Sequence, residues 1–379
     1  MPDKQSGPLA VGGQALLEGV MMRSPNSMAV VCRRPDGQIV LKEEQWISIW
    51  NRLKFLRKPF LRGAIVLVEA MWNGIGALTF SAKIFAEEEV EEKDDTTQAE
   101  DAGGESESSP EESPKKDKDQ GLSSLSIGLT IAFSITAAMA LFMVLPHLAT
   151  AYVGALFGKE LTVDMVSFHL VDGVIKISVF FLYVWAISFM PDIKRTFMYH
   201  GAEHMAISAF DQGKTLTVEN VRPYSTLHPR CGTSFIIIVL LSSILLFSMM
   251  FPFMPKLETM PKILRHLVYI AVKLPLLFPI AGVSYEIIRL AGKYRSNPLL
   301  RLATWPGLMT QKITTKKPTD DMLEISILSL KKCLWREKRV QDGEETAESS
   351  EVVYPNFQAA VEDLGCPEHF FEGGSIEIQ

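Results

Sequence analysis

The chain has 379 residues, of which 47% are hydrophobic, so its length alone allows two or three domains. The formal net charge of −6 comes largely from an acidic internal stretch and from the C-terminus. The sequence contains no basic face with interleaved aromatic residues, which argues against nucleic acid as a partner. The four cysteines are scattered without a C-x-x-C pair, which argues against a disulfide framework and is typical of a reducing compartment.

The N-terminal residues lack the basic start and apolar core of a signal peptide and the Arg- and Ser-rich composition of a transit peptide. We therefore expect a protein of the bacterial inner (cytoplasmic) membrane, inserted through its own helices. The sequence indicates the lipid bilayer as a partner and does not identify protein partners.

Residues 1–59 are predicted to form a small β-rich cap on the cytoplasmic side. Two β-like runs, Met28–Arg33 and Gln38–Lys42, flank the turn signal Arg34–Gly37, in which Pro presets φ and Asp-Gly tolerates a positive φ.

Upstream of these runs, Gly12 and Gly13 precede Glu18 and Arg23. The glycine pair is open to two interpretations, a turn between short strands or a backbone that cradles a ligand. Glu18 and Arg23 are candidate site residues, on a stretch that could fold over a site as a cap.

The stretch Lys42–Arg62 is basic and aromatic, which suits either a headgroup surface or an exposed helix. Residues 60–86 form an apolar stretch that is long enough to span a membrane, but Glu69 would be costly at mid-depth. We expect an interfacial or packed helix there, with a true span as the alternative. Residues 87–120 are acidic and of low complexity, so a disordered linker is predicted.

Residues 121–295 are predicted to form a membrane bundle of four spans. Asp172 and Lys176 are one helical turn apart in the second span, so they could pair at the interface. The fold class expected is mainly α, a polytopic membrane helix bundle of about four spans plus an interfacial or re-entrant helix, with the β-rich cap. The four predicted spans are Leu122–Leu145, Phe168–Met190, Thr233–Met254 and Leu264–Leu290.

Lys and Arg are concentrated in the loop 191–232 and after the fourth span, whereas the loops 146–167 and 255–263 have few. The positive-inside rule then places the loop 191–232 and both termini in the cytoplasm. Residues 296–379 are predicted to contain a juxtamembrane segment, an amphipathic helix that begins at Asp320–Asp321, and an acidic tail.

The loop 191–232 contains the candidate metal ligands and a candidate catalytic base. If Tyr199–Phe210 is a helix, His200 and His204 are four residues apart on one face and can grip one metal ion. Glu203 completes H-x-x-E-H, the inverted zinc-protease pattern, in which the glutamate takes a proton from metal-bound water.

His228 and Cys231 follow in a turn at the entry of the third span and are candidate third and fourth ligands for zinc. Four ligands would make a structural site, and three would leave a position for water. Arg230 could orient an anionic substrate or follow the positive-inside bias. Alternatively, the histidines hydrogen-bond backbone or lipid and Cys231 is a small buried residue. The other histidines, His147, His169, His266 and His369, are expected to be unrelated to this site.

Four motifs carry a resemblance to a known family. They are GGQALLEGVMMRSP, PFLRG at 59–63, YHGAEH at 199–204 and LTVENVRPYSTLHPRCGTSF at 216–235. With the spacing of the spans, they make the chain similar to the DUF1385 family of YqhQ-like bacterial membrane proteins. The resemblance implies a polytopic inner-membrane protein and a metal-dependent enzyme, and it supplies no substrate.

Two hypotheses follow. In the first, His200, His204 and either His228 or Cys231 hold a divalent metal, most simply zinc, and Glu203 is the base of a membrane hydrolase acting on a peptide or lipid-linked substrate. In the second, the protein is a non-enzymatic scaffold, assembly factor or transporter with a structural His/Cys site.

Overall fold

In the computed structural model, the described residues are 9, 11–47, 58–100, 124–159, 161–255, 257, 259–294, 297–344 and 347–365. Of residues 86–100, only the backbone is described. Several parts of the sequence-based predictions lie outside the described residues. They are 1–8 and 10 of the cap, 48–57 of the basic and aromatic stretch, 101–120 of the acidic stretch, 121–123 at the start of the bundle, and 366–379 of the tail.

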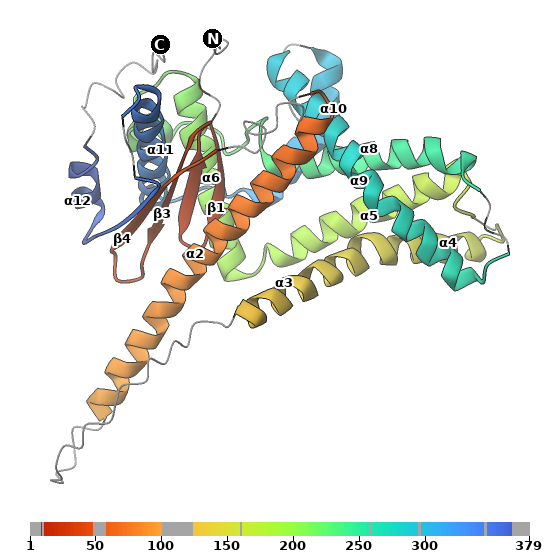
Figure 1. The fold of residues 1–379 in the computed structure, drawn as a ribbon, viewed down its shortest axis with the longest axis horizontal. Coiled ribbons are helices and arrows are strands. Elements are labelled where there is room, and N and C mark those ends of the chain that lie inside the picture. Colours follow the sequence, from red (N-terminus) through yellow and green to blue (C-terminus); the bar gives the residue numbers. More distant parts are fainter. Residues whose placement is uncertain are drawn as a thin grey trace.

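An antiparallel sheet and a bundle of long helices lie side by side (Figure 1). Within the described residues the sheet has five strands in the order β1-β2-β3-β4-β5. The strands are β1 Gly12–Leu16, β2 Gly19–Arg23, β3 Ser27–Arg33, β4 Ile39–Gln45 and β5 Ser349–Tyr354. The predicted hairpin at Arg34–Gly37 is confirmed: it joins β3 to β4, and Gly37 has φ of 91°.

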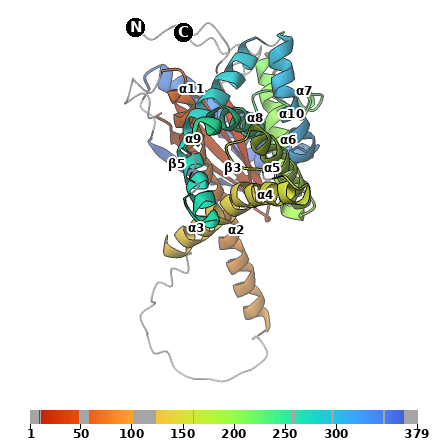
Figure 2. The same ribbon diagram turned by 90° about the vertical axis from the view of Figure 1, so that its right-hand side faces the viewer.

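Both faces of the central strands β2 to β4 are covered, because side chains on both faces of these strands are largely apolar. Val20, Met22, Ala29 and Val31 pack with α6 Pro191–Asp211 and α11 Asp320–Gln341 on one face. Side chains that point the other way meet α2, which runs from Leu61 to Glu100. They are Leu16, Met21, Met28, Val30, Cys32 and Val40. Figure 2 shows α2 leaving the body of the molecule at its acidic end.

The C-terminal segment completes the sheet. β5 pairs antiparallel with β4, and α12 Phe357–Glu362 follows it and packs on α11. The sheet therefore joins residues from both ends of the chain. The local sequence pattern did not predict this pairing, because β4 and β5 are about 300 residues apart in the chain.

Within the described residues, five helical segments are long and apolar enough to cross a membrane, which indicates a membrane protein. They are Leu61–Phe85, Gly128–Leu156, Val166–Ile187, Gly232–Phe253 and Leu264–Ala291. The expected fold class, a mainly helical bundle with a small β-rich cap, is confirmed. The helices that build these segments after α2 are α3 Ser124–Met139, η2 Ala140–Val144, α4 Leu145–Leu156, α5 Val166–Ile187, α8 Gly232–Met250, η3 Phe251–Phe253 and α9 Lys262–Lys293.

The first span of the four does not end at Pro146, as predicted, but continues to Leu156. The π-helical turn Ala140–Val144 directly precedes α4, and Pro146 lies in the first turn of α4. A proline is tolerated there because the wider turn has already interrupted the regular hydrogen-bond ladder.

The apolar stretch 60–86 has two unlike faces in the structure. Glu69 and Asn73 are buried, whereas Val68, Met71 and Trp72 on the opposite face are exposed, Trp72 by 79%. Polar side chains on this helix therefore face protein, which removes the cost of placing Glu69 in lipid. The helical backbone also continues to Glu100, past the predicted start of the acidic linker.

Two further elements connect the sheet to the bundle. The helix α10 Pro298–Thr314 packs on α8, and exposes Leu299, Leu302 and Trp305. The short helix α7 Val218–Val221 lies between α6 and α8 in the chain.

Candidate metal centre

The helix α6 positions the first two candidate ligands, as the sequence predicted. Pro191 begins the helix, where its fixed φ suits the first turn and its missing N–H is not needed. His200 and His204 then lie one turn apart, with ring centroids 4.4 Å from each other. Gly201 lets the backbone at Lys316 approach, since a Cβ there would lie 2.1 Å from the Lys316 carbonyl oxygen.

Cys231 joins these histidines from the start of α8. Its Sγ is 3.2 Å from His200 Nε2, and one ligand atom each of His200, His204 and Cys231 lies within 4.8 Å of the other two. Two imidazole nitrogens and a sulfur at these distances could hold one metal ion.

Backbone carbonyls orient both imidazoles. His200 Nδ1 is 2.9 Å from the Thr314 carbonyl oxygen, and His204 Nδ1 is 2.5 Å from that of Thr226. A carbonyl only accepts, so each Nδ1 carries the hydrogen and each Nε2 presents its lone pair to the centre. His204 Nε2 is buried and has no hydrogen-bond partner among the described residues, so its lone pair is available to a metal ion.

His228 lies next to the group of His200, His204 and Cys231 but is not part of it. Its ring centroid is 5.7 Å from that of His204, and its Nε2 is 3.6 Å from Asp211 Oδ2. The Arg230 backbone N–H donates to His228 Nδ1 at 3.4 Å. Burial lowers the pKa of His228, which favours the neutral ring. The structure therefore brings three of the four predicted ligands together and turns the fourth toward a carboxylate.

Arg230 is also engaged within the protein. Its guanidinium donates to Asp211 Oδ2, the same atom that faces His228. Burial acts to raise the pKa of Asp211, but its contacts with His228 and Arg230 hold that pKa below its ordinary value. The contacts of Asp211 with both His228 and Arg230 were not predicted from the sequence.

Glu203 faces the N-terminal strand. A small cavity of about 90 Å³ is lined by residues of β1, α6 and the turn before α8, including Gly12, Gly13, His200, Glu203, His204 and Cys231. The Gly13 N–H donates to the Glu203 carboxylate. Burial raises the pKa of Glu203 to about 7, although the nearby His200 and the Gly13 hydrogen bond oppose the shift.

The glycine pair lies in a strand over the centre, not in a turn. A Cβ at Gly13 would be 2.8 Å from Glu203 Cγ and 2.8 Å from the Met21 carbonyl oxygen. Only glycine lets the strand approach Glu203 this closely. Val11–Gly13 is therefore the part of the N-terminal segment that covers the site.

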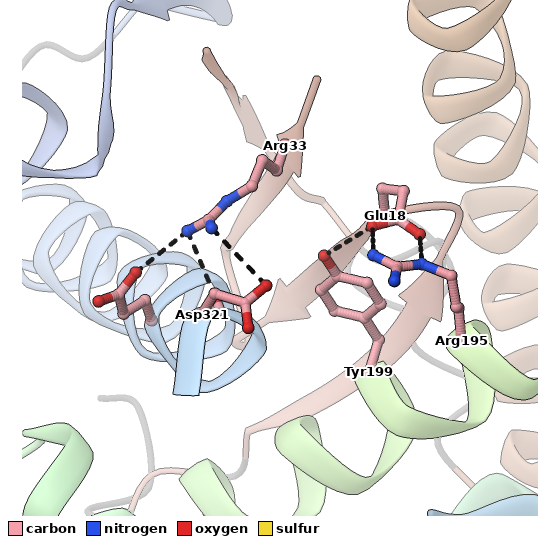
Figure 3. A network of polar contacts seen from close by, with 6 residues as sticks. Glu18, Arg33, Arg195, Tyr199 and Asp321 are labelled. Carbon is pink, nitrogen blue, oxygen red and sulfur yellow. Dashed lines mark hydrogen bonds and ion pairs between the residues drawn. The ribbon is translucent and has the colours of Figure 1, made fainter. Parts of the chain in front are cut away.

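Glu18 and Arg23 lie elsewhere. Glu18, in the turn between β1 and β2 with φ of 47°, receives two hydrogen bonds from the Arg195 guanidinium and one from the Tyr199 hydroxyl at 3.2 Å (Figure 3). Arg23 stacks over Trp46, 5.2 Å from the ring centroid. Glu18 thus ties the β1–β2 hairpin to α6 and positions the covering strand without touching the centre.

A second tie in the same view holds β3 to α11. Arg33 contacts Asp321 at 3.7 Å and Glu324 at 3.0 Å (Figure 3).

Gln311 holds the turn that carries His228 and was not predicted. Its side-chain amide accepts from the His228 N–H at 2.8 Å and donates to the His228 carbonyl at 2.9 Å. It also donates to Ser234 Oγ at 2.9 Å. No local pattern in the sequence distinguishes Gln311, because its role depends on α10 packing against α8.

The fold and the site define a mainly helical membrane protein whose small sheet covers a buried His/Cys centre at the end of the bundle. The model of the family described as "Protein of unknown function (DUF1385)" matches residues 58–336, and the chain belongs to this family. It is 31% identical over 342 residues to "Uncharacterized protein YqhQ" of Bacillus subtilis (strain 168), a match that covers 87% of this chain and 94% of that protein. No solved structure matches.

Proposed function

We propose that the chain is a metal-dependent hydrolase of the bacterial inner membrane. The observation that carries the proposal is the buried Nε2 of His204, which has no hydrogen-bond partner among the described residues and lies with His200 and Cys231 beside the cavity that Glu203 lines. A buried polar atom without a partner is costly, and a bound metal would supply that partner.

Zinc suits this donor set, because it binds imidazole and thiolate together and keeps a position for water when the protein supplies three ligands. His200, His204 and Cys231 would hold it, and the bound metal would acidify a water molecule for attack. Glu203 is proposed to accept the proton of that water, and the Gly13 N–H holds its carboxylate in place. The cover formed by β1 limits access of bulk water to the centre.

The position of the centre supports a substrate that comes from the membrane surface. Cys231 directly precedes α8, one of the apolar segments, so the centre lies at the end of that span. The cavity of about 90 Å³ has room for a reacting group and not for a whole substrate. A peptide or lipid-linked substrate, held mainly by surfaces outside the cavity, fits this space.

The proposed orientation keeps the centre in the cytoplasm. The loop 191–232 carries many of the Lys and Arg residues between spans, and the sheet contains segments from both ends of the chain, so both belong on the same side.

One observation favours the second candidate, a non-enzymatic scaffold, assembly factor or transporter. The His228 ring is 5.7 Å from that of His204, so a rotation away from Asp211 could provide a fourth ligand and close the centre. A closed four-ligand centre would be structural.

Cobalt substitution distinguishes the two. The full-length protein is purified without chelator, its metal is exchanged for Co²⁺, and the visible spectrum is recorded with and without acetohydroxamate, a small metal-binding anion. A hydrolase centre with an open position gives a spectrum that changes on addition of the hydroxamate, and the spectrum of His228→Ala matches that of the native protein. An unchanged spectrum with hydroxamate, together with an altered spectrum in His228→Ala, contradicts the proposal and supports the structural centre.

A further inference from the structure

A second group of ionisable side chains lies inside the bundle, at the opposite end from the sheet. It comprises His147 of α4, His169, Asp172 and Lys176 of α5, and His266 and Lys273 of α9. All are buried except the half-buried His266. From the sequence, these histidines were expected to be unrelated to the His/Cys site, and Asp172 and Lys176 were expected to pair at the interface.

Five of these groups, all but His169, form a continuous chain of contacts. His266 Nδ1 is 2.8 Å from His147 Nε2, and His147 Nδ1 is 3.3 Å from Lys273 Nζ. Lys273 Nζ is 3.6 Å from Asp172 Oδ2, and Lys176 Nζ donates to the same oxygen at 2.6 Å. The three helices thereby bring together residues that are more than 100 positions apart in the chain.

The buried contact network contains more positive than negative groups. One carboxylate, Asp172, faces two ammonium groups, and its Oδ1 has no hydrogen-bond partner among the described residues. The remaining surroundings of Lys273 are the rings of Phe168, Phe247 and Phe251, at 5.4–5.7 Å, and the imidazole of His169 is also near. A fixed structural ion pair would have one cation for each carboxylate. Here the second ammonium group is an unbalanced charge in an apolar bundle, and its charge is removed when it releases a proton.

The direction of the hydrogen bonds gives that proton a route. An ammonium group only donates, so Lys273 donates to His147 Nδ1, and His147 must carry its own hydrogen on Nε2, facing His266. His266 is near the start of α9, at the end of the bundle far from the sheet, and Lys273 is seven residues deeper, roughly 10 Å along the helix.

We propose that these side chains form a proton-binding site inside the membrane, with Lys273 as the group that gains and loses the proton and with His147 and His266 as its route to the far surface. On release, the N–H bond of Lys273 breaks as an N–H bond forms at His147 Nδ1. At the same time the Nε2–H bond of His147 breaks and an N–H bond forms at His266 Nδ1. His266 then passes a proton to water, and His147 returns to neutrality with its hydrogen on the other nitrogen.

Nitrogen-15 NMR of the lysine side chains tests this site in the full-length protein held in lipid nanodiscs. Lys273→Arg identifies the Lys273 resonance and keeps a cation at that position, so that loss of the fold does not confuse the assignment. The proposal predicts that this resonance changes from the ammonium to the amine form between about pH 5 and pH 9, because burial disfavours the charged form of a lysine. The resonance of the exposed Lys159 serves as the reference and remains ammonium.

The route is tested with His147→Phe, which keeps an aromatic ring and removes both nitrogens. Exchange of the Lys273 hydrogens with solvent should slow by about 100-fold, since a positioned imidazole contributes that order to a proton transfer. Lys159→Met is the matched control and should leave the exchange unchanged. A Lys273 resonance that stays ammonium throughout the pH range overturns the proton-binding site, and exchange that is as fast in His147→Phe as in the native protein overturns the route.

Discussion

Replacing Gly13 by Ala tests whether the N-terminal strand covers the candidate centre as closely as the structure places it. The added Cβ would lie 2.8 Å from both Glu203 Cγ and the Met21 carbonyl oxygen. The neighbours must move by roughly 0.6 Å to reach ordinary contact at 3.4 Å, and one of them is a backbone atom of the paired strand β2. Overpacking of this kind typically costs about 1–3 kcal/mol.

Gly12 provides a matched control in the same strand, since a Cβ there meets no described atom within 4 Å. We expect Gly13→Ala to lower the thermal unfolding midpoint of the full-length protein in detergent and to weaken zinc binding, because the strain falls on Glu203 beside the ligands. Gly12→Ala should leave both quantities at their native values. Equal behaviour of the two variants, in either direction, would refute the close approach of β1 to the centre.

Three further predictions rest on separate contacts. Gly201→Ala should destabilise the protein more than Gly13→Ala, because its Cβ would lie 2.1 Å from the Lys316 carbonyl oxygen. Gly76→Ala, on an open helical surface, is the control and should stabilise the protein slightly. Equal unfolding midpoints of Gly201→Ala and Gly76→Ala would contradict the packing of α6. Gln311→Leu should cost about 1–3 kcal/mol for each His228 backbone group left unpaired, measured by chemical unfolding. Gln358→Leu removes an exposed hydrogen bond to Glu362 within one helix and should be neutral. Brominated lipids should quench less tryptophan fluorescence in Trp72→Phe than in the native protein, with Trp335→Phe unchanged, if the exposed face of α2 meets lipid.

The sequence predicted the parts of the centre that depend on local geometry. His200 and His204 are one helical turn apart on any helix, and Cys231 is placed by the start of an apolar span. The orientation of His228 was beyond such reasoning, because Asp211 and Gln311, which hold it, belong to α6 and α10. Likewise the covering role of Gly13 depends on the packing of β1 against α6.

Long-range pairing explains the other differences between the predicted and the observed fold. The SSEVVY segment alternates too weakly to identify its partner, and only the sheet shows that β5 pairs with β4. Asp172 and Lys176 were predicted as a local pair, and their 2.6 Å contact exists, but Lys273 and His147 from two other helices bury it. A charge pattern within one span cannot reveal neighbours that come from other spans.

Elemental analysis of the full-length protein, purified in detergent without chelator, tests the candidate centre most directly. The proposed hydrolase centre predicts one zinc ion for each chain in the native protein and in Glu203→Gln, because Glu203 is not among the proposed ligands. It predicts loss of that zinc in His204→Ala and Cys231→Ser, while His228→Ala retains it. A native protein without a transition metal, or a His204→Ala protein that keeps the full amount, would contradict the account.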